Sequence, residues 1–413
     1  MESDEFPRSS TRQSVNCSPY VDQLTGFSGD LDLKQRSNLI HLENCLNSEW
    51  ALGKNNIISW CPAGNGILII IAPHYAIAEY VTAVDSDRSL SDQVKVSASF
   101  ITDLISGDRQ LSHTQLQKVS RLLHIEPRLI ELRQSLTKEP LETEIIEKMI
   151  RRYSVNYVAS RAVTLFDIVG FGLLTPFEQM TQLNSLSYSL NSAHAKMLEL
   201  DVEINFARST TGDGFYIWNR DEGLTANVNL YHFMHLVLAD NAIASKKSLA
   251  KTVPELRACF HVGSCYEFHQ AEGLNPTIHD FIVGEVTIEL ARMIDAACPG
   301  QILVGDFMTN LFEQQKAPRI DLVSDLDAIS FLQRAQNSLS KLKGLELSGE
   351  RVTAIKCYLT GEELSNGEFS IRRLDITDKH GRTRVAYNAK INIYRDTAQP
   401  ILLGIQDKKL QLG

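Results

Sequence analysis

The fold of this 413-residue chain is decided by the stretch Leu165-Phe166-Asp167-Ile168-Val169-Gly170-Phe171-Gly172. Residues 160–166 have the apolar pattern of a buried strand, and helical spacing of apolar residues runs from about Pro176 to Leu198. The strand therefore delivers one carboxylate, Asp167, just before a glycine-containing turn and a helix. Backbone N–H groups of such a turn, together with the helix N-terminus, can donate hydrogen bonds to a polyphosphate. An acid beside them can hold a divalent cation.

A second carboxylate lies at the tip of a predicted hairpin, Thr211-Gly212-Asp213-Gly214-Phe215. If the strand that ends at Asp167 pairs beside this hairpin, the two carboxylates converge. With the backbone carbonyl of Ile168 they form an all-oxygen site suited to Mg²⁺ or Mn²⁺, which keep water ligands and bind substrate phosphates. The chemistry implied is two-metal phosphoryl or nucleotidyl transfer. Each motif alone is weak, because an aspartate in a β-turn is more often a turn former than a ligand.

The composition is that of an ordinary globular protein rather than a disordered or fibrous one. Hydrophobic residues make up 43% and charged residues 22%, and the length allows two or three domains. The net charge of −9 gives no general attraction to nucleic acid or to anionic membranes. The most apolar run, residues 67–72, is far shorter than a membrane-spanning helix. We therefore expect neither nucleic acid nor a membrane as partner.

The cysteine pattern and the first residues favour a reducing, cytoplasmic location. The seven cysteines form no Cys-x-x-Cys pair, and an odd, scattered set argues against a disulfide framework. The first ten residues are polar and acidic and carry no apolar signal region. The chain also lacks a Gly-x-x-x-x-Gly-Lys-Ser/Thr loop, which excludes a P-loop ATPase on motif grounds.

Strands and helices mix along the chain, so the pattern predicts an α+β protein. After the hairpin we expect helices and strands in alternation, and beyond Gly344 the pattern becomes strand-like. The expected helices are 227–244 and 284–297, and the expected strands are 258–266, 301–304, 351–359, 369–374 and 384–394. We divide the chain into an unstructured tail, an N-terminal domain, a helical linker, a catalytic core and a C-terminal extension with closing strands: 1–14, 15–135, 136–157, 158–310 and 311–413.

Taken together, the two motifs resemble those of the class III adenylate/guanylate cyclase catalytic domain. That family has a strand ending in Phe-x-Asp-Ile-x-Gly-Phe, a long helix, a Gly-Asp-Gly-Phe hairpin, and later a helix ending in Asn-x-x-x-Arg before a proline-glycine turn and an apolar strand. Residues 281–304 are similar to the last part, with Arg292 at the arginine position. The order and spacing hold from about Ala159 to Asp306. The resemblance implies an α+β fold with a ferredoxin-like βαββαβ core.

By this resemblance Asp167, Asp213 and the carbonyl of Ile168 would hold two Mn²⁺ or Mg²⁺ ions. Arg292 would stabilise the pentavalent phosphate. The reaction would be attack of the ribose 3′-OH on the α-phosphate with loss of pyrophosphate, and positioning and charge neutralisation would supply the catalysis. The residues that would contact the nucleotide are Phe166, Val169, Gly170, Phe171, Gly172, Ser209, Phe281 and Lys379.

Three positions depart from the family pattern. The asparagine that stabilises the transition state, four residues before the arginine, is replaced by Ile288, whose side chain has no hydrogen bond to donate. The purine-selecting lysine and the purine-selecting aspartate or threonine are replaced by Ser209 and Phe281, with Arg208 and Asp280 next to them. The metal ligands are thus kept while the purine-selecting residues are lost. Either the base is not a purine, or residues from elsewhere recognise it.

The N-terminal part has the form of a degenerate second copy of the same motifs. Residues 22–28 and 61–67, with a helical stretch between them, repeat the order of the catalytic motifs, and Asn65 stands in place of the hairpin aspartate. Residues 117–122 mirror Asn-x-x-x-Arg, which makes Arg121 a further candidate catalytic residue. Alternatively, the Asn-Gly pair is a plain hairpin turn, because it is a strong turn signal in any β protein. The helical pattern around Arg121 also fits a helix-turn-helix piece, a use that the acidic chain disfavours.

The resemblance implies a nucleotide cyclase that makes a 3′,5′-cyclic nucleotide and pyrophosphate, in a site between two cyclase-like domains of a homodimer or of one chain. Because the purine-selecting residues are lost, we favour a pyrimidine substrate, UTP ahead of CTP, similar to the cyclases of the bacterial anti-phage systems called Pycsar. The product would then be a second messenger for a separate effector that senses cyclic nucleotides. Two alternatives stay open: an adenylate or guanylate cyclase with a rearranged base pocket, and a catalytically inactive cyclase-homology module with a regulatory role.

Overall fold

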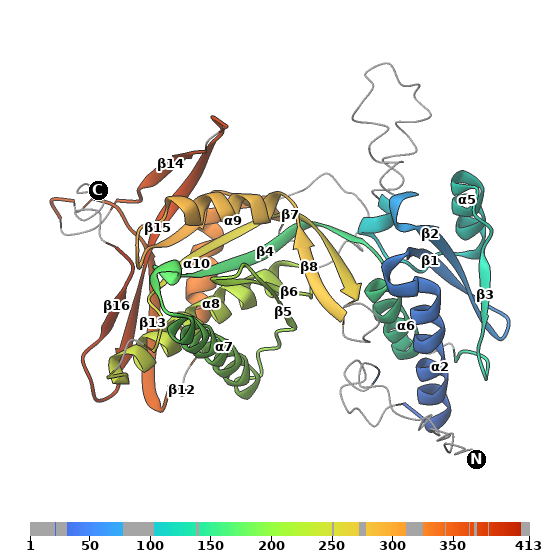
Figure 1. Ribbon diagram of the computed structural model, residues 1–413, viewed down its shortest axis with the longest axis horizontal. Coiled ribbons are helices and arrows are strands. Elements are labelled where there is room, and N and C mark those ends of the chain that lie inside the picture. The colour runs from blue at the N-terminus through green and yellow to red at the C-terminus, as the bar shows by residue number, and fades with distance from the viewer. Residues whose placement is uncertain are drawn as a thin grey trace, which may run out of the picture. The chain divides into compact units, whose positions relative to one another are not determined.

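The contacts within the chain divide it into two compact units, each described here by itself. The first unit comprises residues 1–156 and 268–278, and the second comprises 157–267 and 279–413. Figure 1 traces the chain through both units. The computed structural model describes residues 21, 31–76, 103–137, 140–249, 252–271, 278–310, 325–342, 344–362, 364–366, 370–378 and 380–405.

A mixed sheet forms the centre of the second unit. Along its main path the strand order is β12-β13-β15-β9-β7-β4-β6-β5, and β8, β14 and β16 pair with β7 or β15. The strands are β4 (Asn156–Ile168), β5 (Phe206–Thr210), β6 (Gly214–Asn219), β7 (Leu256–Ala271), β8 (Ile278–Val283), β9 (Ile302–Gly305), β12 (Leu345–Leu347), β13 (Glu350–Leu359), β14 (Arg373–Thr377), β15 (Thr383–Arg395) and β16 (Ile401–Leu403). A separate small pair is formed by β10 (Met308–Asn310) and β11 (Asp325–Asp327).

The helices of this unit connect the strands in the order expected from the sequence. They are the short η2 (Phe171–Leu173), α7 (Pro176–Glu199), α8 (Leu224–Lys247), α9 (Glu285–Ala296) and α10 (Ala328–Leu339). The segment β4-α7-β5-β6-α8-β7 has the spatial order β7-β4-β6-β5, in which the first strand lies between the fourth and the third. This is the ferredoxin-like βαββαβ arrangement, so the predicted α+β fold is confirmed. The strand expected at 369–374 instead begins at Arg373, where β14 pairs with β15 across a turn.

Helices cover both faces of the sheet (Figure 1). Successive residues of β4 point to opposite layers, as the pleat requires. Phe166 and Ile168 lie in a core shared with α7, α8 and α10, whereas Val163 and Leu165 lie in a core shared with α9. The strand that carries Asp167 is therefore buried on both faces, which fixes its register firmly.

The first unit contains a three-stranded antiparallel sheet in the order β1-β2-β3. Its elements are α2 (Leu33–Trp50), the short η1 (Ala51–Gly53), β1 (Asn55–Ala63), β2 (Gly66–Pro73), α5 (His113–Leu123), β3 (Arg128–Glu131) and α6 (Pro140–Arg152). The apolar run 67–72 is part of β2. Among the residues that the structure describes, no helix combines the length and the hydropathy needed to cross a bilayer.

Helix α6 falls within residues 136–157, for which the sequence predicts a linker. Its side chains Ile145, Ile146, Met149 and Ile150 are nevertheless buried in the core of the first unit, against α2 and the sheet. An amphipathic helix that buries its apolar face in this way stabilises the unit it packs against. The helix thus acts as a structural part of the first unit.

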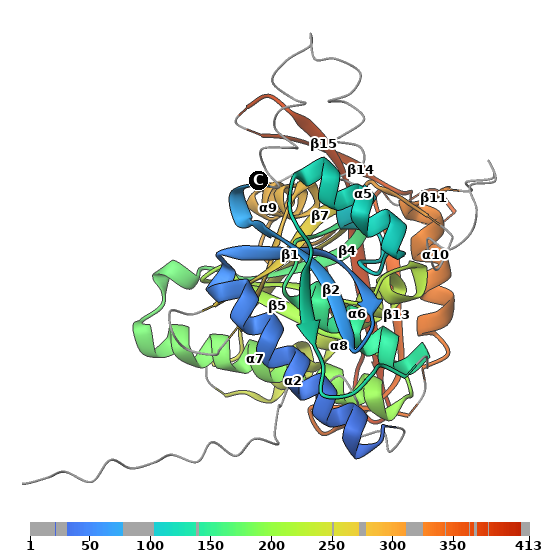
Figure 2. The same ribbon diagram turned by 90° about the vertical axis from the view of Figure 1, so that its right-hand side faces the viewer.

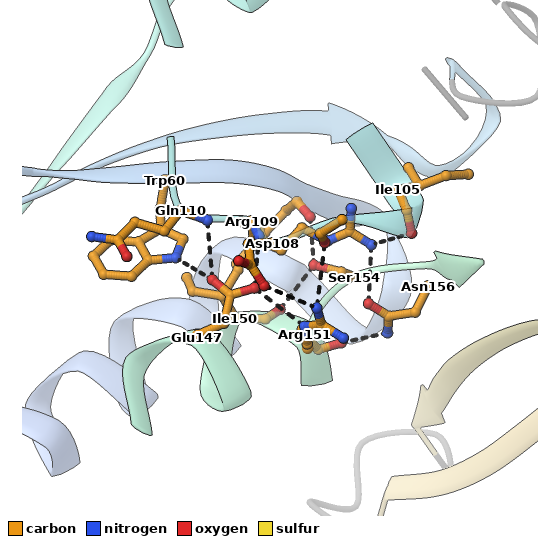
Figure 3. A network of polar contacts seen from close by, with 12 residues as sticks. Trp60, Ile105, Asp108, Arg109, Gln110, Glu147, Ile150, Arg151, Ser154 and Asn156 are labelled. Carbon is orange, nitrogen blue, oxygen red and sulfur yellow. Dashed lines mark hydrogen bonds and ion pairs between the residues drawn. The ribbon is translucent and has the colours of Figure 1, made fainter. Parts of the chain in front are cut away.

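A polar network around Glu147 of α6 ties the first unit together (Figure 3). The carboxylate accepts hydrogen bonds from the indole Nε1 of Trp60 at 2.8 Å and from the backbone N of Arg109 at 2.6 Å. The guanidinium of Arg109 is almost fully buried and donates to the carbonyls of Leu104, Ile105 and Val155 and to Oδ1 of Asn156. Buried charge is tolerated here because each of these contacts replaces a bond to water.

Replacing this buried guanidinium should destabilise the protein strongly. We expect Arg109→Met to lower the free energy of unfolding by about 3 kcal/mol, because three buried carbonyls lose their donor. Arg128→Met is the control, since Arg128 is 65% exposed in its ion pair with Glu49 and such pairs contribute at most about 1 kcal/mol. Urea denaturation followed by tryptophan fluorescence measures both. Equal midpoints for the two variants would contradict the assignment.

Two histidines in the core of the second unit are buried in neutral form. Burial lowers the pKa of His235 to about 4 and the pKa of His261 to about 4. Nδ1 of His235 donates to the carbonyl of Tyr231 at 2.6 Å, and its ring packs against the ring of Tyr231. His261 packs edge-on against Phe307. Among the described residues no carboxylate contributes to the pKa of either ring, so burial dominates.

Acid should therefore unfold the second unit. An unfolded histidine takes up a proton near pH 6.5, whereas these two resist protonation until about pH 4, so stability is lost as the pH falls through this window. Between pH 7 and pH 5 each contributes a loss of about 1–2 kcal/mol. His235→Gln should make the free energy of unfolding less dependent on pH, and the exposed His113→Gln should not. Urea titrations at several pH values test this, and parallel pH profiles for both variants would refute it.

Candidate active site

The two carboxylates singled out in the sequence come together at one edge of the second unit. Strands β4 and β6 are antiparallel, with Phe166 opposite Phe215 and Asp167 opposite Gly214. Asp213 occupies the turn between β5 and β6, directly before this pairing. The structure therefore places Asp167 and Asp213 side by side, as the sequence predicts from the two motifs.

The backbone of the hairpin approaches β4 very closely at this point. The N–H of Ile168 donates to the carbonyl of Asp213 at 3.0 Å. A Cβ atom on Gly214 would collide with the carbonyl oxygen of Phe166, so only glycine fits. This position explains physically why a glycine follows the aspartate in the hairpin motif.

Asp167 is held between a like charge and an opposite one. Its side chain is buried, and burial raises its pKa; the neighbouring Asp213 raises it further through its charge and a hydrogen bond between the carboxyl groups. Arg257 opposes both effects, because its Nε and Nη2 donate to Oδ2 of Asp167 at 2.8 and 2.5 Å. The net direction is upward, so desolvation outweighs the arginine.

Arg257 is a site residue that the sequence analysis does not identify. It stands near the start of β7, and its Nη1 also donates to the carbonyls of Ile294 and Ala297 at the C-terminal end of α9. These carbonyls carry the negative end of the helix dipole, which favours a cation there. The signal that was present in the sequence is a single charge in an otherwise apolar strand, Leu256-Arg257-Ala258-Cys259-Phe260.

The donor set at this edge suits a hard divalent cation. Asp167 and Asp213 offer carboxylate oxygens, and Ile168 offers a backbone carbonyl, which are ligands that Mg²⁺ and Mn²⁺ accept. Among the described residues no cluster of three or more His, Cys, Asp or Glu side chains has the arrangement of a metal site. An ion held here would thus complete its shell with water or substrate oxygens. The residues present fit such an ion, with Arg257 competing for one oxygen of Asp167.

The turn after β4 contains two glycines and leads through η2 into α7. The N–H of Val169 donates to the carbonyl of Glu255 at 3.0 Å, and Gly170 adopts a left-handed conformation with φ of 66°. Gly170 and Gly172 are exposed and Phe171 is half-buried. Thr175 then caps α7, with its hydroxyl accepting from the N–H of Glu178. Phe166, in contrast, is fully buried in the core, which leaves only its backbone for any contact with a nucleotide.

Arg292 and Ile288 lie on the outward face of α9. The guanidinium of Arg292 forms an ion pair with Asp295 at 3.3 Å and approaches Asp378 to 4.0 Å. Among the described residues it makes no hydrogen bond or ion pair with Asp167 or Asp213. Ile288 is 52% exposed, one turn before it. Arg292 is half-buried, and the structure brings neither position to the acid pair of the same unit.

The residues expected to select the nucleotide base are spread over β5 and β8. Ser209 is half-buried on β5, opposite Tyr216, and Phe281 is half-buried on β8. Asp280, the acid next to Phe281, is bound by the guanidinium of Arg220. Arg208 is exposed and lies over the ring of Phe215, 5.5 Å from its centroid.

Two further candidate residues expected from the sequence are Arg121 and Lys379. Arg121 is an exposed residue in the last turn of α5 of the first unit, and its catalytic role stays a prediction. Lys379, expected to contact the triphosphate, lies outside the described residues, as do residues 22–28 of the proposed N-terminal repeat. The neighbouring Asp378 has its pKa held well below the usual range, first by the backbone N–H of Arg382 and also by the charge of Arg384.

The hairpin of the first unit repeats the backbone geometry of the acid pair. Gly66 lies opposite Glu131 of β3, the N–H of Leu132 donates to the carbonyl of Asn65 at 2.9 Å, and a Cβ on Gly66 would collide with the carbonyl of Ile130. In this copy Asn65 therefore corresponds to Asp213, and Glu131 corresponds to Asp167. The motif order in the sequence instead predicts the matching strand before the hairpin, at residues 22–28.

Comparisons with known proteins give structural matches but no sequence matches. No family model matches the chain, and no curated protein does. Among solved structures, the adenylyl cyclase CyaB from P. aeruginosa matches 60% of this chain and 97% of its own, with 12% identity and a TM-score of 0.33. The guanylate cyclase domain of RhGC from Catenaria anguillulae, in complex with GTP, matches 58% and 100%, with 13% identity and a TM-score of 0.33. The guanylyl cyclase domain of the RhoGC fusion protein from Blastocladiella emersonii matches 58% and 99%, with 14% identity and a TM-score of 0.34.

Because Gly214 lies so close to β4, we expect the stability of the protein to fall sharply when one methyl group is added at this position. Gly214→Ala should lower the free energy of unfolding by about 2 kcal/mol or more, because the backbone of Phe166 cannot move out of the core. Gly172→Ala is the control, since a Cβ there meets no atom within 4 Å. Urea denaturation of both purified variants tests the expectation. A Gly214→Ala protein as stable as Gly172→Ala would show that the hairpin does not pack against β4 in this way.

Proposed function

We propose that the chain is a nucleotide cyclase of the class III type, which converts a nucleoside triphosphate into a 3′,5′-cyclic nucleotide and pyrophosphate. The observation that carries the proposal is the pairing of Asp167 with Asp213 next to a glycine-containing turn that opens a helix. Two carboxylates at this spacing repel each other without a cation, and their presence on a rigid, buried framework is explained by a metal-dependent reaction of phosphates.

Each side chain at this edge has a distinct task in the proposed reaction. Asp167 and Asp213, with the carbonyl of Ile168, would hold two Mg²⁺ or Mn²⁺ ions, which supply activation of the attacking oxygen and neutralisation of the triphosphate. The N–H groups of residues 170–172 and the N-terminus of α7 would orient the phosphates, since the N–H of Val169 already donates to the carbonyl of Glu255. Arg257 balances the acid pair in the absence of substrate and is placed to share its charge with an incoming phosphate.

The outward face of α9 supports a site completed by a second cyclase-like domain. Arg292 is half-buried on that face, and among the described residues it makes no hydrogen bond or ion pair with the acid pair of its own unit. We propose that it acts on the triphosphate held by another cyclase-like domain, in a homodimer or a domain pair. The matching geometry around Asn65 and Glu131 supports the first unit as a degenerate cyclase-like copy, in which an amide has replaced one metal-binding carboxylate.

We further propose a pyrimidine substrate, UTP ahead of CTP. Ser209 and Phe281 offer neither the cation nor the carboxylate that selects a purine in the family that the chain resembles. Asp280 does not easily take the place of the purine-selecting carboxylate, because the guanidinium of Arg220 already binds it. A cyclic pyrimidine nucleotide would serve as a second messenger for a separate effector, as in the anti-phage systems that use such products.

The test is product formation from each of the four nucleoside triphosphates. Purified protein is incubated with ATP, GTP, CTP or UTP and Mn²⁺, and the products are separated and identified by mass. We expect cyclic UMP in greatest yield. Cyclic AMP or cyclic GMP would instead support a purine cyclase with a rearranged base pocket, and no cyclic product from any of them would favour the regulatory module.

The role of the acid pair is tested by one isosteric change. Asp213→Asn should lower product formation at least about a hundredfold, because the ligand charge is lost at the point where charge develops. Its melting temperature should stay within about 2 °C of the wild type. Asp325→Asn, on an exposed strand of the same unit, is the control and should keep full activity. An Asp213→Asn protein with unchanged yield would overturn the assignment of this residue.

A further inference from the structure

One face of α7 exposes apolar side chains along almost its whole length. Phe177 is 72% exposed, Met180 is 55%, Tyr188 is 62% and Leu198 is 51%. These positions, with the exposed Asn184, Asn191 and Ala195, follow one another at intervals of three or four residues. Such spacing places them on a single stripe of a helix. We call these seven residues the α7 stripe.

The composition of the α7 stripe is unusual for a surface exposed to water. None of its seven members is charged, although surface helices normally carry many Lys, Arg, Asp and Glu residues on the outward face. The charged residues of α7 have other partners: Glu178 belongs to the capping box, and Lys196 pairs with Glu199 at 2.8 Å. An exposed, uncharged and largely apolar face of this kind marks an interaction surface.

The opposite side of α7 is fully used within the second unit. Leu186, Leu190, Ala193 and Met197 are buried in the core that α7 shares with α8. Figures 1 and 2 both show α7 running beside α8. The helix is thus anchored firmly by one face, so the α7 stripe is a rigid, preformed surface. Preformed surfaces lose less conformational entropy on binding.

The order of residues in the α7 stripe is complementary to itself. If a second α7 crosses antiparallel about a two-fold axis near Tyr188, Phe177 lies opposite Leu198 of the second copy and Met180 lies opposite Ala195. The larger side chains of one end therefore meet the smaller ones of the other. Asn184 lies opposite Asn191, where two amides can donate to and accept from each other. An isologous contact requires this kind of reciprocity, because every residue pair occurs twice.

The size of the surface agrees with a dimer contact. From Phe177 to Leu198 the stripe is about 33 Å long at 1.5 Å per residue. Phe177 and Tyr188 can each bury on the order of 150 Å², and Met180, Leu198 and Leu173, which is 93% exposed just before α7, add to this area. The surface therefore suits an interface at the lower end of the roughly 1,200–2,000 Å² that stable complexes bury in total.

We propose that the α7 stripe is a homodimer interface in which α7 packs antiparallel against α7 of a second copy of this chain. Tyr188 lies nearest the two-fold axis and acts as the anchor of the contact. The surface is separate from the outward face of α9, and the proposal does not depend on the enzymatic activity. Leu173 connects the interface to the turn 169–172, so dimerisation would also hold that turn in place.

The first experiment measures the mass of the full-length protein by sedimentation over a range of concentrations. We expect a dimer at micromolar concentration. Tyr188→Lys should raise the dimer dissociation constant about thirtyfold or more, the effect of losing one central anchor. Circular dichroism and the melting temperature should stay unchanged, because the side chain is exposed in the monomer. A wild type that is monomeric throughout, or a Tyr188→Lys protein that dimerises as well as wild type, would overturn the proposal.

A pair of charge variants tests the antiparallel geometry itself. In the variant that combines Asn184→Lys with Asn191→Lys, like charges would face each other twice, and the dimer should dissociate. In the variant that combines Asn184→Lys with Asn191→Glu, opposite charges would face each other, and the dimer should persist. Equal dissociation of the two variants would exclude this pairing. A dimer that tolerates both would place the contact elsewhere.

Discussion

The candidate site depends on how closely the β5–β6 hairpin approaches the end of β4. The N–H of Ile168 meets the carbonyl of Asp213, and Gly214 leaves no room for a side chain beside Phe166. This contact sets the register of β4 against β6, and β4 is in turn fixed by cores on both of its faces. Two carboxylates that would otherwise separate are thus held together by backbone geometry and core packing, with the energy of folding opposing their repulsion.

Because the hairpin holds Asp213 beside Asp167, the negative charge of the pair has to be balanced. Asp167 is desolvated and lies beside another acid, so the structure supplies Arg257 and, through it, the carbonyl groups at the end of α9. The arginine links three elements that are distant in sequence: β4, β7 and α9. Such a link makes the electrostatics of the acid pair sensitive to the position of α9. Helix α9, which carries Arg292, is therefore physically connected to the acid pair through Arg257.

Much of this arrangement could be predicted from the sequence, and the reasons for the rest are specific. Asp167 and Asp213 were predictable because a strand end and a hairpin tip are local patterns, and their pairing follows from the strand order. Arg257 was not, because its partners lie 37 to 90 residues away and one charge in a strand has no local signature. The register of β3 was missed for a similar reason: a short strand, Arg128–Glu131, with mostly exposed residues gives little periodicity. The buried face of α6 had a helical pattern, but a pattern does not show what covers it.

The two copies of the hairpin geometry also differ in the order in which their strands leave the ribosome. In the second unit β4 is synthesised before the hairpin that pairs with it. In the first unit the hairpin comes first, and β2, with its run Ile67-Leu68-Ile69-Ile70-Ile71, has one edge unpaired until β3 emerges. An apolar edge of this kind is prone to pair with other chains before β3 has been synthesised. The edge of β2 is thus a part of the nascent chain that needs protection until β3 has been synthesised.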